Sequence, residues 1–150
     1  MVGQIFHVGL TVSDLKRSIA FYRDVLGLYF LGEILMEGPE TEKMFGRKGC
    51  KARVAYLNAF EQSDLPPVEL IQFEDEAAAV VQSNLFSTSI SELCFFTDDI
   101  EETYQQLCDQ NVECLSEPQY FDFSNKGFGK SKAFYFRDPD GIILEMMQPL

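Results

Sequence analysis

His7-Val8-Gly9-Leu10-Thr11-Val12-Ser13-Asp14-Leu15 decides the fold, because Glu92-Leu93-Cys94-Phe95-Phe96-Thr97-Asp98-Asp99-Ile100 repeats its pattern. In both stretches, apolar and β-branched residues predict a strand. A serine or aspartate then offers a helix N-cap ahead of an apolar residue. Further along, Glu69-Leu70-Ile71-Gln72 matches Glu145-Met146-Met147-Gln148. Two matches in the same order predict that the chain contains two similar halves.

The first half is predicted to run strand, helix, strand, strand, strand. Leu15, Ile19, Tyr22 and Leu26 recur at helical spacing, and Gly27 suits the end of that helix. Residues 37–51 contain several glycines and predict a loop with a short helical turn. The expected strands are residues 5–12, 28–35, 53–60 and 68–73.

The second half repeats this order after a change in composition. We expect a first module at residues 1–74, a linker at 75–89 and a second module at 90–150. The Asp138-Pro139-Asp140-Gly141 sequence predicts a turn. The expected strands are 92–97, 112–115, 133–136 and 142–147, and the helix carries Ile100, Tyr104 and Leu107.

Charge and hydrophobicity argue against nucleic-acid binding and against a membrane-spanning protein. The formal charge of −12 argues against nucleic acid, whose binding needs a positive surface. No apolar run is long enough to span a membrane. The predicted strand near the N-terminus leaves no room for an export signal. Together with four cysteines that lack disulfide or zinc-finger spacing, this predicts a cytoplasmic protein with reduced thiols.

The repeat places four chemistry-bearing residues at matched positions. His7 and Glu92 begin equivalent strands, and Glu69 and Glu145 lie in equivalent final strands. A carboxylate in an apolar strand is costly to bury unless it is paired or binds a cation. Two modules around a pseudo-twofold axis would bring these residues together as a divalent-metal site. The alternative is that each glutamate faces solvent on an alternating strand.

These motifs resemble the vicinal oxygen chelate superfamily, which includes glyoxalase I, methylmalonyl-CoA epimerase, extradiol dioxygenases and fosfomycin-resistance proteins. The resemblance covers nearly the whole chain and implies an α+β fold. Two βαβββ modules would pair into a glyoxalase-like open barrel around a metal held by His7, Glu69, Glu92 and Glu145. Its other specific segments are Phe21-Tyr22-Arg23-Asp24-Val25-Leu26-Gly27-Leu28 and Phe136-Arg137-Asp138-Pro139-Asp140-Gly141.

Several positions depart from the better-known members. Many of these have histidine where this chain has Glu92, so Glu92 is either a weak ligand or base, or the site prefers Mn²⁺ or Fe²⁺ over Zn²⁺. We leave the metal open among Mn, Fe, Ni, Co and Zn. Extradiol dioxygenase chemistry needs two histidine ligands, and His7 is the only histidine. Thr11 and Phe73 replace the residues that bind glutathione in glyoxalase I.

The resemblance favours a metal-dependent, glyoxalase I-like lyase or isomerase acting on a small hydroxycarbonyl or hemithioacetal. The metal would stabilise an enediolate, and Glu145, with Glu92 as second candidate, would move the proton. Phe95, Phe96, Phe134, Phe136, Met146 and Met147 could form an apolar pocket around that carboxylate.

Two alternatives remain, an acyl-CoA epimerase and a non-catalytic protein that binds a small molecule. Arg47, Arg53 and Lys130 could neutralise a substrate anion, or they could be solvated surface cations. The resemblance also implies a homodimer, and the four ligands could meet either within one chain or across the two chains.

Overall fold

The structure is a computed structural model that describes residues 2–150. The chain divides into two compact units, one ending at Val80 and the other beginning at Val81. No helix within the described residues has the length and apolar character needed to cross a membrane. The two units have the same strand topology.

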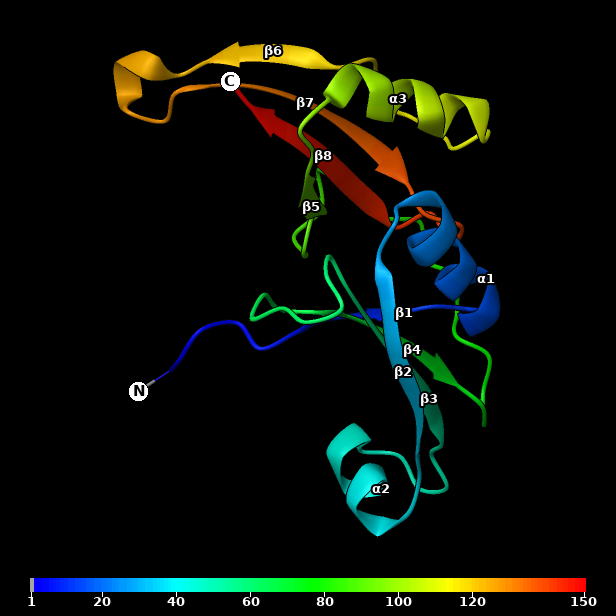
Figure 1. The fold of residues 1–150 in the computed structure, drawn as a ribbon. Coiled ribbons are helices and arrows are strands. Elements are labelled where there is room, and N and C mark those ends of the chain that lie inside the picture. The colour runs from blue at the N-terminus through cyan, green and yellow to red at the C-terminus, as the bar shows by residue number, and fades with distance from the viewer. Residues whose placement is uncertain (1) are drawn as a thin grey trace. The chain divides into compact units, whose positions relative to one another are not determined.

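The first unit is a four-stranded sheet with strand order β1-β4-β3-β2. Strands β1 and β4 are parallel, and the other neighbours are antiparallel. Figure 1 traces the chain through this sheet. Its elements are β1 (Val8–Thr11), α1 (Leu15–Ala20), the π-helical turn η1 (Phe21–Val25), β2 (Tyr29–Met36), α2 (Pro39–Phe45), β3 (Ala52–Asn58) and β4 (Val68–Phe73).

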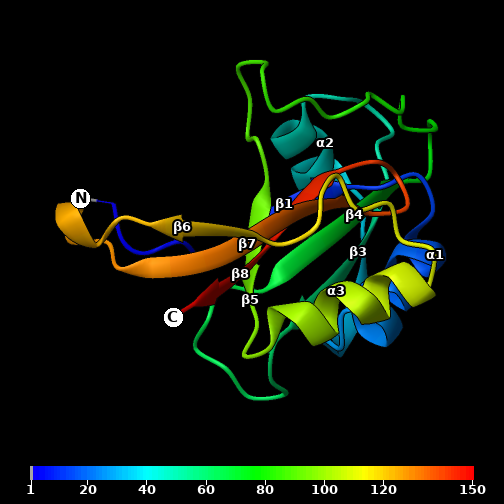
Figure 2. The same cartoon turned by 90° about the horizontal axis from the view of Figure 1, so that it is seen from above.

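The second unit repeats this arrangement with strand order β5-β8-β7-β6. Here β5 and β8 are the parallel pair. Helix α3 runs alongside this sheet in Figure 2. The elements are β5 (Leu93–Phe96), α3 (Ile100–Asp109), β6 (Gln119–Asp122), the short turn η2 (Ser124–Lys126), β7 (Lys130–Arg137) and β8 (Ile143–Pro149). Two βαβββ units therefore confirm the fold class expected from the repeat.

Each sheet buries one face beneath its helix. In the first unit, Leu57 and Leu70 are fully buried together with Leu15 of α1. In the second, the ring of Tyr104 on α3 packs edge-on against Phe134 of β7, with centroids 5.3 Å apart. Successive side chains on a strand point to opposite faces. Glu69 is adjacent in sequence to the buried Leu70, and Glu145 to the buried Leu144. Both glutamates consequently lie on the sheet face turned away from the helix.

Two details differ from the sequence-based expectation. Residues 112–115 do not form a strand, and only Cys114 makes an isolated bridge, to Phe136. The fourth strand of that sheet is β6, whose four residues are all exposed. An edge strand exposed on both faces does not need the apolar alternation that reveals a half-buried strand. The first helix also changes pitch, because Leu26 N–H bonds to the carbonyl of Phe21 five residues earlier.

Candidate metal centre

The site in the first unit is built on Glu69, the second residue of β4. Its strand neighbours in register are Gly9 on β1 and Tyr56 on β3. His7 immediately precedes β1 and lies outside the strand that was expected to include it. Glu69 is only 8% exposed, which makes it one of the few buried charged residues. A buried carboxylate of this kind needs partners.

Glu69 has a different partner at each carboxylate oxygen. The Tyr56 hydroxyl donates a 2.7 Å hydrogen bond to Oε1, and His7 Nε2 lies 3.3 Å from Oε2. The hydrogen bond to Glu69, together with burial and the carboxylate charge, raises the pKa of Tyr56 to about 12. The tyrosine therefore stays a hydrogen-bond donor across the physiological pH range.

The His7 and Glu69 donor atoms fit a shared divalent ion. Ligand atoms that each lie about 2.1 Å from a tetrahedral or octahedral ion are roughly 3.0–3.4 Å apart. The 3.3 Å between Nε2 and Oε2 falls in that interval. An imidazole nitrogen and a carboxylate oxygen are also donors that Mn²⁺, Fe²⁺ and Zn²⁺ accept. The first unit thus supplies two donor atoms at a separation that suits a shared divalent ion.

The second unit carries the matched pair, Glu92 and Glu145. Glu92 immediately precedes β5, as His7 precedes β1, and Glu145 lies in β8. The register neighbours of Glu145 are Cys94 on β5 and Tyr135 on β7. Desolvation, followed by hydrogen bonding and charge from Glu145 and the charge of Glu92, raises the pKa of Cys94 to about 12. Desolvation and the same two carboxylates also raise the pKa of Tyr135.

The structure therefore groups the predicted ligands in pairs. His7 contacts Glu69, and Glu92 and Glu145 both act on Cys94 and Tyr135. Among residues 2–150, no three histidine, cysteine, aspartate or glutamate side chains are grouped closely enough to hold a metal ion.

Sequence reasoning missed the two tyrosines, although a signal for them was present. Lys51-Ala52-Arg53-Val54-Ala55-Tyr56-Leu57 matches Lys130-Ser131-Lys132-Ala133-Phe134-Tyr135-Phe136 in its basic and aromatic positions. This third match of the repeat places one tyrosine opposite each glutamate. Cys94 is exposed and, being in register with Glu145, shares its sheet face.

The expected apolar pocket around Glu145 is largely wrong. Phe134, Phe136 and Met146 are buried, and Phe95 is in register with Met146. These residues lie on the helix-covered face, opposite Glu145, because strand side chains alternate. Of the six residues proposed, Phe96 and Met147 pair with each other on the face that carries Glu145. Their neighbourhood is less enclosed, since Phe96 is 66% exposed.

The three cations expected to bind a substrate anion all have carboxylate partners within their own unit. Arg47 Nε lies 2.9 Å from Asp75 Oδ2, and Lys130 Nζ lies 3.7 Å from Asp122 Oδ2. Arg53 pairs with both Glu33 and Glu74. A substrate anion would have to compete with these carboxylates.

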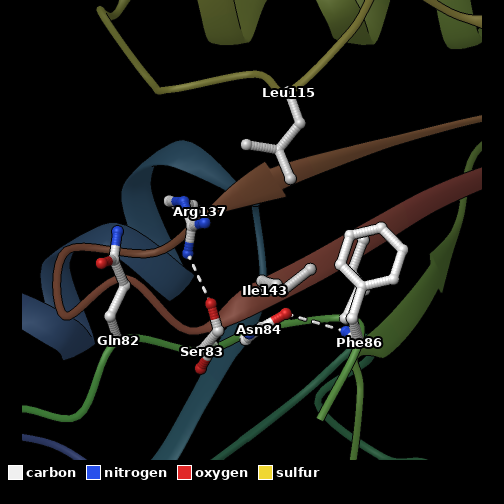
Figure 3. A pocket seen from close by; sticks show the side chains of 8 residues that line it. Gln82, Ser83, Asn84, Phe86, Leu115, Arg137 and Ile143 are labelled. Atoms are coloured by element: carbon white, nitrogen blue, oxygen red, sulfur yellow. Dashed lines mark hydrogen bonds between the residues drawn. The ribbon is translucent and has the colours of Figure 1, made fainter.

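A cavity of about 310 Å³ lies in the second unit, between residues 82–86 and one end of the sheet. Figure 3 shows Arg137 reaching into it, with a hydrogen bond to the carbonyl of Ser83. Arg137 also donates a 2.8 Å hydrogen bond to the carbonyl of Gly141. Ile143 lines the same cavity and precedes Glu145 by two residues, so both lie on one sheet face. Through its bond to Ser83, Arg137 connects the segment 82–86 to the sheet that carries Glu145.

The repeated topology and the matched carboxylates define a glyoxalase-type α+β protein. A sequence profile of the Glyoxalase/Bleomycin resistance protein/Dioxygenase superfamily matches residues 4–146, and the chain belongs to this superfamily.

Individual relatives agree with this assignment. The chain is 32% identical to the metallothiol transferase FosB of Staphylococcus saprophyticus, over 97% of this chain and 77% of that protein. A glyoxalase family protein of Bacillus cereus has the same fold, with a TM-score of 0.83, 20% identity and coverage of 100% and 96% of the two chains. The trypanothione-dependent glyoxalase I of Leishmania major matches with a TM-score of 0.66 and 20% identity, over 98% and 87%. The two solved structures show that the chain shares their fold.

Proposed function

We propose that the chain is a metal-dependent enzyme in which His7, Glu69 and Glu145 hold a divalent ion and Glu92 serves as a further ligand or as a base. The observation that carries this proposal is the approach of His7 Nε2 to Glu69 Oε2 at 3.3 Å. That pair occupies the same positions in the first unit as Glu92 and Glu145 in the second. The superfamily's metalloenzymes give the second line of support.

The first candidate reaction is glyoxalase I-like proton transfer in a small hydroxycarbonyl or hemithioacetal. A bound divalent ion would act as a Lewis acid toward the substrate oxygens. Glu145 and Glu92 are the carboxylates able to take a proton from one carbon and return it to its neighbour. The tyrosine beside Glu145, Tyr135, keeps its proton because its pKa is raised by desolvation and by the two carboxylates. It can therefore donate a hydrogen bond to a substrate oxygen.

The second candidate is thiol transfer, which is favoured by the 32% identity with a metallothiol transferase. In this reaction a small thiol attacks an electrophilic carbon, its sulfur–carbon bond forms, and the bond to the leaving oxygen breaks. Glu145 or Glu92 would accept the thiol proton and then return it to the oxygen released from carbon. Both candidate reactions use the same carboxylates. Identifying the substrate would therefore distinguish the two reactions.

One set of NMR assays separates the candidates. Untagged, Zn²⁺-loaded protein would be incubated in D₂O with a hemithioacetal, with an acyl-CoA, or with a small thiol and an epoxide. Deuterium incorporation into the hemithioacetal supports the lyase or isomerase, and incorporation at the acyl α-carbon supports the epimerase alternative. Thioether formation supports thiol transfer. If the protein has none of these activities but a ligand raises its melting temperature, the non-catalytic binding protein is supported instead.

We also expect a homodimer, since superfamily members often form their clefts between two chains. Light scattering coupled to size-exclusion chromatography would measure the mass against the 17.1 kDa of one chain. A mass of one chain at micromolar concentration would contradict this expectation.

A further inference from the structure

The hydroxyl of Tyr56 and the carboxylate of Glu69 form a cross-strand pair within the first unit. The two residues are directly opposite each other in the β3–β4 register, and the hydroxyl donates to Oε1 at 2.7 Å. The other oxygen, Oε2, is thereby left facing His7 Nε2 at 3.3 Å. Tyr56 and His7 therefore contact different oxygens of the same carboxylate.

The opposite side of Glu69 is confined by Gly9. A Cβ atom at position 9 would lie 3.2 Å from Glu69 Oε2 and 3.4 Å from Ile71 Cδ1. Glycine therefore leaves just enough room for the carboxylate in its present orientation. Tyr56 holds one oxygen, and the β1 backbone borders the other. A free glutamate side chain has several rotamers, and fixing them in advance lowers the entropy lost when a ligand binds.

From this geometry, we propose that Tyr56 is a positioning residue that orients Glu69 so that Oε2 and His7 Nε2 bind one divalent ion. The inference rests on the proposed function, because it concerns the same metal. Carboxylates that bind metals are commonly held by a hydrogen bond from a second residue, and loss of that residue typically costs about 10- to 100-fold in metal affinity. Tyr56 itself does not contact the ion.

The single histidine makes this inference directly measurable, because only His7 contributes imidazole signals. Zn²⁺ would be titrated into ¹⁵N-labelled, untagged, metal-free protein while the His7 imidazole resonances are followed. Tyr56→Phe removes only the hydroxyl. We expect the Zn²⁺ concentration at the midpoint of the titration to rise about 10- to 100-fold. Tyr29→Phe is the matched control on β2 of the same unit, where the side chain is exposed. Its midpoint should equal that of the wild type.

Gly9→Ala tests the same orientation without removing the hydrogen bond. The added methyl group would displace Oε2 and should also raise the midpoint, so the test survives if Tyr56→Phe fails to fold. Wild-type midpoints in both variants, together with weakened binding in Glu69→Gln, would overturn the role of Tyr56 and leave the metal site intact. No response of His7 to Zn²⁺ in the wild type would overturn both the inference and the proposed metal centre.

Discussion

Gln72 accepts a hydrogen bond from the backbone N–H of Leu15, with its Oε1 2.8 Å from the nitrogen. Gln148 makes the equivalent bond to Ile100 at 3.2 Å. Each glutamine lies in the last strand of its unit and satisfies an N–H in the first turn of the helix, where no intrahelical acceptor exists. The internal repeat therefore extends from sequence to individual hydrogen bonds.

Replacing either glutamine should destabilise its unit by a similar amount. We expect Gln72→Ala and Gln148→Ala each to lower the free energy of unfolding by about 1 kcal/mol, the usual net value of one hydrogen bond. Urea denaturation followed by circular dichroism measures the change. Gln62→Ala is the control, because Gln62 is exposed in the connection between β3 and β4. An effect equal to that of Gln62→Ala would show that these bonds do not hold the helices.

The two helix caps give a second stability prediction. Asp14 accepts a hydrogen bond from Arg17 N–H and Asp99 from Glu102 N–H, both at 3.0 Å. Asp14→Ala and Asp99→Ala should each cost about 1 kcal/mol of unfolding free energy, whereas asparagine at either position should nearly retain it. Urea denaturation is again the measurement. Equal losses for alanine and asparagine would indicate that the side-chain oxygen is not the stabilising feature.

A pH dependence is expected from Asp75. Partial burial favours a higher pKa, but hydrogen bonds from the backbone N–H groups of Lys51 and Asp75 and the charge of Arg47 outweigh it and lower the pKa. A carboxyl with a depressed folded-state pKa stabilises the protein above its unfolded pKa of about 3.9, and this contribution is lost as the pH falls through the folded value.

Asp75→Asn should therefore be less stable than the wild type at neutral pH, with the difference shrinking in acid. Unfolding curves at neutral pH and well below pH ~3.9 would measure it. Asp64→Asn, in the exposed connection, is the control. A difference that persists unchanged in acid would rule out the ion pair with Arg47 as its cause.

Glu92 and Glu145 should respond differently to removal of their charge. If Glu92 is mainly a base, Glu92→Gln should retain the metal and lose about 100-fold in turnover, a typical value for general base catalysis. Glu145→Gln should lose both the bound metal and the turnover. Metal content and turnover of the substrate identified by NMR would be measured together, with exposed Glu61→Gln as the control. Loss of metal in both variants would instead make Glu92 a true ligand.

The sequence was sufficient to predict the features that repeat. The matched segments correctly predicted two βαβββ units, and β4 has the expected bounds of Val68–Phe73. The same matches predicted a metal site that includes His7 and Glu69, and in the structure His7 Nε2 lies 3.3 Å from Glu69 Oε2. Local patterns worked here because one face of each strand is buried, so that apolar residues mark it.

Other features depended on information that no local pattern contains. Tyr56 meets Glu69 only because the hairpin register places them opposite each other, and that register is set by the whole β3–β4 pairing. The aromatic residues assigned to a pocket around Glu145 were apolar enough, but Phe134 and Phe136 face the helix. For these rings the local pattern was sufficient, because strand alternation places Phe134 and Phe136 on the face opposite Tyr135 and Glu145.

The central claim is that one ligand pair from each unit contributes to a single metal centre. Metal content after Mn²⁺ loading and desalting, measured by inductively coupled plasma mass spectrometry on untagged protein, tests this most directly. We predict one ion per chain in the wild type and in Glu61→Gln, and loss of the ion in both His7→Ala and Glu145→Gln, which alter different units. Absence of metal from the folded wild type, or full retention in either of the last two variants, would contradict the claim.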